Sequence, residues 1–160
     1  MGKEHPKTAS VAASLSKSLG PQPGIYQFRR SESGQLRVGE QRTDLALRLL
    51  EQSVLGFLTM VQPGHFVAEV AAVLARLKPT DAHDDLDDFL NISFSTLASP
   101  EIYATALDLA LRYRHHLFDT LYHAVALNTP GAVLVTADER YYNKTRLEGQ
   151  ISLLADFRFP

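Results

Sequence analysis

Short apolar strands alternate with helices from about Thr43 to the end of this 160-residue chain, and this alternation limits the fold more than any other feature. Strands are expected at Leu55–Val61, Ile92–Leu97, Ala132–Thr136 and Ile151–Leu154. Helices are expected from Thr43, over Phe66–Leu77, Thr80–Leu90 and Pro100–Tyr113, near Asp119 and from about Arg140. Because parallel strands need long crossovers that are usually helical, this order predicts an α/β fold with a mostly parallel central sheet.

The first 42 residues differ from the remainder of the chain. They are rich in Pro, Gly, Ser and Gln, and only Ile25–Phe28 has the character of a strand. Residues 1–43 hold seven Lys/Arg and three acids, a balance of +4, whereas residues 44–160 hold nine and fifteen, a balance of −6. Such a segment buries too little apolar surface to offset its ordering entropy. We expect residues 1–42 to be irregular and disordered, and residues 43–160 to form one domain.

Several classes of function have no support in this sequence. The chain contains no cysteine, so disulfides, thiolate zinc sites and cysteine nucleophiles are excluded. The common glycine-rich nucleotide motifs and the His-Glu-x-x-His zinc motif are also absent. No apolar run approaches the roughly 20 residues that span a bilayer. We therefore expect a cytoplasmic protein without a membrane segment, whose chemistry rests on acidic residues.

Three acids occupy positions where carboxylates can act on a ligand. Asp119 lies at the start of a helix, and Asp138 follows the apolar strand that comes next. Acids at such ends are often only helix caps, and that alternative stays open. Glu69 lies in an otherwise apolar helix, where it is either an acid at the margin of the buried face or a paired or ligating group. Together the three carboxylates could converge on a divalent cation.

Basic and histidine side chains accompany these acids. Arg140 and Lys144 follow Asp138 closely and could contact phosphates, although an exposed amphipathic helix explains them equally well. His123 falls four residues after Asp119, on the same helical face. It could orient the carboxylate or contact substrate, and the alternative is a packing or surface histidine.

Three motifs together resemble the PIN-domain family, especially its VapC-like toxin ribonucleases. They are Phe66-x-x-Glu69-Val-Ala-x-Val-Leu, Phe118-Asp119-x-x-Tyr122 and Leu134-Val-Thr-Ala-Asp138. The resemblance runs from about Thr43 to Phe157. It implies a PIN-like α/β/α sandwich that hydrolyses RNA with Mg²⁺ or Mn²⁺, and it implies an RNA substrate, a cognate antitoxin protein and a homodimer.

The resemblance also assigns roles to residues. Glu69, Asp119 and Asp138 match the family's acidic metal ligands and are the expected catalytic residues. Thr136 matches a hydroxyl that supports the site. Arg140, Lys144 and His123 are expected to bind substrate.

One part of the family pattern is missing. The family begins with an apolar strand that ends in Asp, but residues 1–43 contain no aspartate, and the usual spacing leads to Arg29. We therefore expect the first strand to be missing or altered, as in a frame-shifted or replaced N-terminus. Two functions follow: a metal-dependent ribonuclease impaired by loss of its first acidic ligand, or a catalytically inactive PIN-like protein that acts through protein contacts. A DNA-directed nuclease would use the same site.

Overall fold

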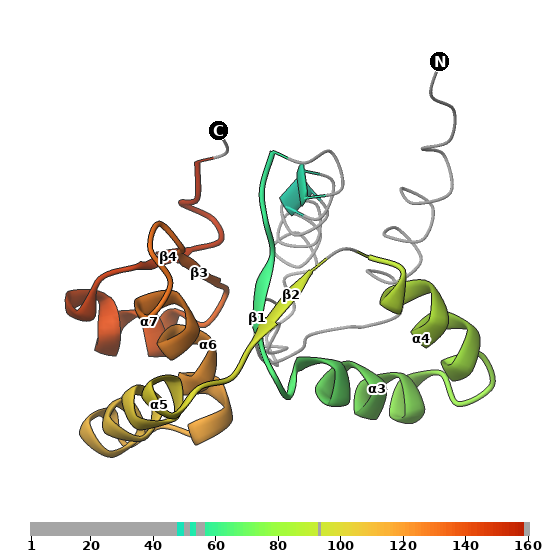
Figure 1. The fold of residues 1–160 in the computed structure, drawn as a ribbon, viewed down its shortest axis with the longest axis horizontal. Coiled ribbons are helices and arrows are strands. Elements are labelled where there is room, and N and C mark those ends of the chain that lie inside the picture. Colours follow the sequence, from blue (N-terminus) through green and yellow to red (C-terminus); the bar gives the residue numbers. More distant parts are fainter. Residues whose placement is uncertain (1–47, 50–51, 54–56, 93, 159–160) are drawn as a thin grey trace, which may run out of the picture.

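The computed structural model of the chain describes residues 48–49, 52–53, 57–92 and 94–158. Residues 48–49 and 52–53 are helical. The later elements, labelled as in Figure 1, are β1 (Val61–Pro63), α3 (Phe66–Leu77), α4 (Ala82–Leu90), β2 (Ser95–Leu97), α5 (Pro100–Tyr113), α6 (Leu117–Leu127), β3 (Leu134–Thr136), α7 (Glu139–Thr145), a 3-10 turn η1 (Arg146–Glu148) and β4 (Ile151–Leu153). The segment in which a first strand was expected lies outside the described residues.

All four strands pair in parallel, as the helical crossovers between them require. β1 pairs with β2 so that Val61 faces Ser95, and β3 pairs with β4 so that Leu134 faces Ile151. Within the described ranges the strands form two separate pairs rather than one continuous sheet. Parallel strands with helices on both sides confirm the predicted α/β class.

Helix α6 is the centre of the fold because every residue from Thr120 to Ala126 is buried. Tyr122 and Ala126 belong to one apolar cluster, whose other buried members are Phe66, Val70, Leu74, Phe89, Ile92, Leu134 and Tyr141. Leu121, Ala124 and Val125 pack instead against Ile102 and Ala106 of α5. A helix that is buried on all sides must lie between two packed surfaces. The packing of α6 against both apolar clusters therefore fixes the position of its first turn.

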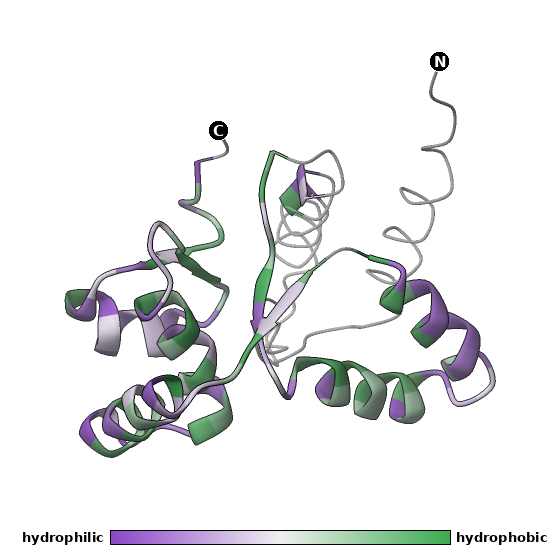
Figure 2. Cartoon of the chain, viewed as in Figure 1, coloured by the Kyte–Doolittle hydropathy of each residue, from purple (hydrophilic) through white to green (hydrophobic). Residues whose placement is uncertain are grey.

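The remaining helices lie on either side of the β1–β2 pair (Figure 1). α3 and α4 lie on one side, and α5 and α6 pack together on the other. Figure 2 shows that α4 is hydrophilic over most of its surface, because four of its residues are aspartates. The helices in the described part of the chain are all too short or too polar to cross a membrane.

Helix boundaries follow the sequence signals closely. α3 has the predicted bounds, and α5 begins where Ser99 caps it, since the Ser99 hydroxyl accepts a hydrogen bond from the Ile102 N–H at 3.4 Å. Pro100 fills the first helical position, where no N–H is needed. α4 begins at Ala82, after an N-cap at Asp81, rather than at Thr80 as predicted.

The strands are shorter than predicted. β1 shares only Val61 with the predicted strand, and the described residues from Phe57 to Met60 are not in a strand. Pro63 is the last residue of β1. A proline has no backbone N–H and cannot donate to the ladder, which agrees with the strand ending there. Similarly, Ile92 is not in β2 but packs beside Phe89 in the core.

Candidate functional site

Helices α3 and α6 and the end of β3 carry the three predicted acids, and Glu69 and Asp138 lie close enough to Asp119 to affect it electrostatically. Glu69 lies in the first turn of α3, Asp119 in the first turn of α6, and Asp138 at the N-cap of α7. Burial raises the pKa of Asp119, and the charges of Glu69 and Asp138 raise it further, whereas His115 and His116 lower it. A cation near Asp119 would offset the unfavourable effect of these neighbouring negative charges.

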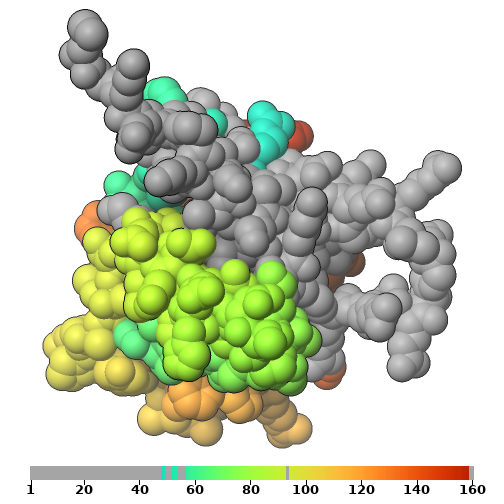
Figure 3. All heavy atoms as spheres, turned by 90° about the vertical axis from the view of Figure 1, so that its right-hand side faces the viewer, coloured from blue at the N-terminus to red at the C-terminus, as the bar shows by residue number. Residues whose placement is uncertain are grey.

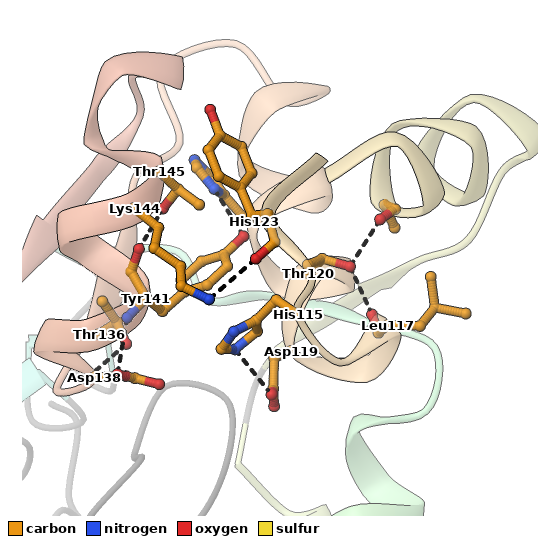
Figure 4. Close-up of polar contacts among 12 residues, drawn as sticks. His115, Leu117, Asp119, Thr120, His123, Thr136, Asp138, Tyr141, Lys144 and Thr145 are labelled. Carbon is orange, nitrogen blue, oxygen red and sulfur yellow. Dashed lines mark hydrogen bonds and ion pairs between the residues drawn. The ribbon is translucent and has the colours of Figure 1, made fainter. Parts of the chain in front are cut away.

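Asp138 is held rigidly at its position (Figure 4). Its Oδ1 accepts a hydrogen bond from the Tyr141 N–H at 2.9 Å, which caps α7, and its own N–H donates to Thr136 Oγ1 at 3.1 Å. The cap alternative is therefore correct for Oδ1. The second oxygen, Oδ2, has no hydrogen-bond partner in the described part of the chain. Thr136 is buried and supports Asp138 through the backbone.

Glu69 is oriented by two side chains that the sequence analysis did not connect with it. The Tyr122 hydroxyl donates to Glu69 Oε2 at 2.5 Å, and His65 Nε2 lies 3.4 Å from Glu69 Oε1. Burial and the bond to Glu69 raise the pKa of Tyr122, so the phenol keeps its proton. The start of α6 reaches the surface beside α3 (Figure 3). The centroid of the His65 ring lies 5.0 Å from that of Phe118, the residue that precedes Asp119.

His115 makes the corresponding contact with Asp119. Its Nε2 lies 3.2 Å from Asp119 Oδ2, and its ring lies 4.6 Å from the Tyr141 ring (Figure 4). Burial lowers the pKa of His115, the charges of Asp119 and Asp138 raise it, and Lys144 and Arg140 lower it. This imidazole therefore lies among the acids and the bases of the site.

Sequence reasoning missed both histidines, although a signal was present. His65 precedes Glu69 by four residues, and His115 precedes Asp119 by four. That spacing places a pair on one face of a helix or of its N-cap.

The three predicted substrate-binding residues are placed differently from one another. Arg140 and Lys144 are close enough to His115 to affect its pKa, and the Lys144 ammonium donates to the Tyr113 carbonyl at 3.0 Å. His123, in contrast, is fully buried, with its Nε2 2.8 Å from the Gly149 carbonyl oxygen and its Nδ1 3.1 Å from the Tyr141 hydroxyl. Its position favours the packing alternative, because a buried ring cannot contact a polymer.

The donor chemistry of this site fits a divalent cation. Carboxylate oxygens suit Mg²⁺ and Mn²⁺, and the Nε2 atoms of His65 and His115 are buried without a hydrogen-bond partner in the described residues. No three His, Asp or Glu side chains among those residues lie close enough to hold one ion together. The described residues therefore provide two His–carboxylate pairs, and a cation bound at either pair would need further ligands.

Comparison with known proteins gives one match. The family model described as PIN domain matches residues 36–147, a range that contains Glu69, Asp119 and Asp138. No curated protein and no solved structure matches the chain. Proteins of this family have a nuclease-type fold and generally depend on a metal ion.

Proposed function

This chain belongs to the PIN-domain family, and from that premise we propose that it is a metal-dependent ribonuclease of the VapC toxin type. The observation that supports the proposal best is that Glu69, Asp119 and Asp138 come from three separate elements and lie close enough for the charges of Glu69 and Asp138 to raise the pKa of Asp119. Clustered negative charge of this kind favours binding of a cation. As a toxin, the protein would act in the cytoplasm and be held inactive by a cognate antitoxin protein.

Each residue of the site has a definite part in this proposal. Glu69, Asp119 and Asp138 would hold Mg²⁺ or Mn²⁺, which when bound activates water and stabilises charge on a phosphate. Thr136 fixes the backbone of Asp138, and Tyr122 fixes Glu69. Arg140 and Lys144 provide positive charge at the edge of the acids, where they would hold the RNA backbone. Residues 1–43 contain no aspartate that could serve as the family's first-strand acid, so we expect cleavage to be slower than with a complete site.

The purified full chain tests this proposal directly. We expect cleavage of single-stranded RNA in Mg²⁺ or Mn²⁺, none in excess EDTA, and recovery when metal is returned, because the carboxylates alone repel the phosphate. A single-stranded DNA of the same sequence, assayed in parallel, distinguishes a ribonuclease from a DNA-directed nuclease. Absence of cleavage by protein whose circular dichroism shows it to be folded would contradict an enzymatic function.

A second candidate function, a PIN-like protein that acts only through protein contacts, is favoured by the outer face of α5. Tyr103, Leu107 and Leu111 follow one another at four-residue intervals and are 51%, 51% and 70% exposed. Two copies of α5 could bury this apolar stripe against each other and so remove it from water. This face suits a homodimer, with or without catalysis.

The oligomeric state tests the role of this face. We expect the full chain to be a dimer by light scattering, and L107E together with L111E to make it a monomer, because two charges would be buried without partners. Leu90→Glu is the matched control, since Leu90 of α4 is 50% exposed but lies outside the stripe. A monomeric wild type, or an α5 variant that still dimerises, would exclude this interface.

A further inference from the structure

We propose that Phe118, together with the rings of His116 and His65 beside it, forms an aromatic platform on which the site stacks an unpaired nucleobase of its RNA substrate. The inference rests on the proposed function and deepens it, because it identifies the residue that selects single-stranded RNA over a duplex. The family resemblance includes Phe118 in one of its motifs but assigns no role to its ring.

Phe118 is a large aromatic residue that the core does not use. It is 47% exposed, although residues 120–126 of the same helix are buried. It belongs to none of the apolar clusters that the described residues form. Single exposed apolar side chains are common on protein surfaces, so exposure by itself indicates no function. What distinguishes Phe118 is the set of groups around it.

Two histidine rings lie against Phe118. The ring centroid of His116 is 5.4 Å from that of Phe118, with 31° between the two planes, and the centroid of His65 is 5.0 Å away at 56°. His116 is exposed like Phe118, whereas His65 also contacts the buried Tyr122 ring at 5.2 Å. Unpaired RNA bases stack on phenylalanine and histidine rings. Rings already held by their neighbours lose little freedom when a base binds.

The aromatic platform adjoins the acids of the site. Phe118 directly precedes Asp119, and His116 lies close enough to that carboxyl to lower its pKa. On the other side of the ring, His65 Nε2 lies 3.4 Å from Glu69 Oε1. A base stacked on Phe118 would therefore belong to a nucleotide next to the phosphate that the acids act on.

Positive charge for the RNA backbone lies near the same acids. Arg140 and Lys144 are close enough to His115 to lower its pKa, and His115 Nε2 lies 3.2 Å from Asp119 Oδ2. The basic residues would hold phosphates while Phe118 holds a base. Within a duplex the bases stay stacked on one another, so only a single strand can offer a base to the ring.

Binding of a fluorescent single-stranded oligouridine, followed by anisotropy, tests this inference without an activity assay. Every protein is the full chain carrying Asp119→Asn in EDTA, so that the RNA stays intact and one repelling charge is removed. We expect Phe118→Ala to weaken binding about 5–150-fold, which is the effect of losing one stacked base. Phe118→Trp should keep the affinity. An RNA duplex of the same length should bind equally with and without Phe118→Ala.

Three comparisons separate stacking from other roles of the ring. Phe118→Leu keeps apolar bulk without an aromatic face and should bind as weakly as Phe118→Ala. Phe57→Ala is the matched control, because Phe57 is 67% exposed but lies before β1, outside the aromatic platform, and it should change nothing. Phe118→Ala should leave the dependence of log Kd on log salt unchanged, whereas Lys144→Ala should lower that slope by about one.

The outcomes also separate this inference from the proposed function. Unchanged oligouridine affinity in folded Phe118→Ala and Phe118→Leu, equal weakening of duplex binding, or failure of the parent Asp119→Asn chain to bind oligouridine would each overturn the inference. Metal-dependent cleavage by the wild type would still support the proposed function in those cases. Ring-dependent binding of single strands by a wild type that cleaves no RNA would support the inference and refute the nuclease.

Discussion

Replacing Asp119 with asparagine is expected to slow metal-dependent RNA cleavage at least about 100-fold. Loss of a residue behind a metal ligand costs about 10–100-fold in affinity or activity, so loss of a ligand should exceed the upper end of that range. Asn keeps the shape of the side chain but removes the charge that balances the cation. The measurement is the initial rate on single-stranded RNA at saturating Mn²⁺ for both proteins.

The same substitution should not destabilise the fold. Burial raises the pKa of Asp119, which means that the folded protein holds its charged form at a cost. An uncharged amide avoids that cost, so the free energy of unfolding of metal-free Asp119→Asn should equal or exceed that of the wild type. Asp108→Asn, on the exposed face of α5, is the control and should cleave at the wild-type rate. Equal rates for Asp119→Asn and wild type would remove Asp119 from the site.

Much of the fold follows from local sequence signals. The apolar stripe of Phe66–Leu77 and the Ser99-Pro100 start fix α3 and α5, because periodicity and capping are properties of the segment itself. The same is true of Asp138, whose place after a strand and before a helix is visible in the sequence. These signals placed all three acids on the correct elements.

Features that depend on tertiary contacts were less predictable. His123 and Asp119 share a helix, but His123 lies in the buried part of α6, from Thr120 to Ala126, whereas Asp119 lies in its first turn. The pairing of strands into two separate ladders depends on residues far apart in the chain. The orientation of His65 depends on Phe118 and Tyr122, which are more than 50 residues away and could not be read from its neighbours.

The largest effect on stability is expected from His123→Leu. This substitution should lower the free energy of unfolding by about 3 kcal/mol, because a buried polar group left without its partner costs about 1–3 kcal/mol. The Tyr141 hydroxyl and the Gly149 carbonyl would both lose their bond to the imidazole. The Tyr141 side chain is buried, so water cannot easily replace that bond. Urea denaturation of both proteins gives the difference. His83→Leu, at an exposed position, should stay within about 0.5 kcal/mol of wild type.

His123 should also make the wild type sensitive to acid. Burial lowers the pKa of His123. The hydrogen bond to the Gly149 carbonyl and the charge of Glu148 on η1 raise it, but by less, so the folded protein keeps the ring neutral. The unfolded chain binds that proton at a pKa of about 6.5. Stability from this residue is therefore complete above that pH and is lost as pH falls below it, by at most about 1.4 kcal/mol per pH unit. His115, whose pKa burial also lowers, adds a slope of the same sign to both proteins. Between pH 7 and 5 the wild type should thus lose more stability than His123→Leu, and parallel profiles would show that His123 is already charged in the folded protein.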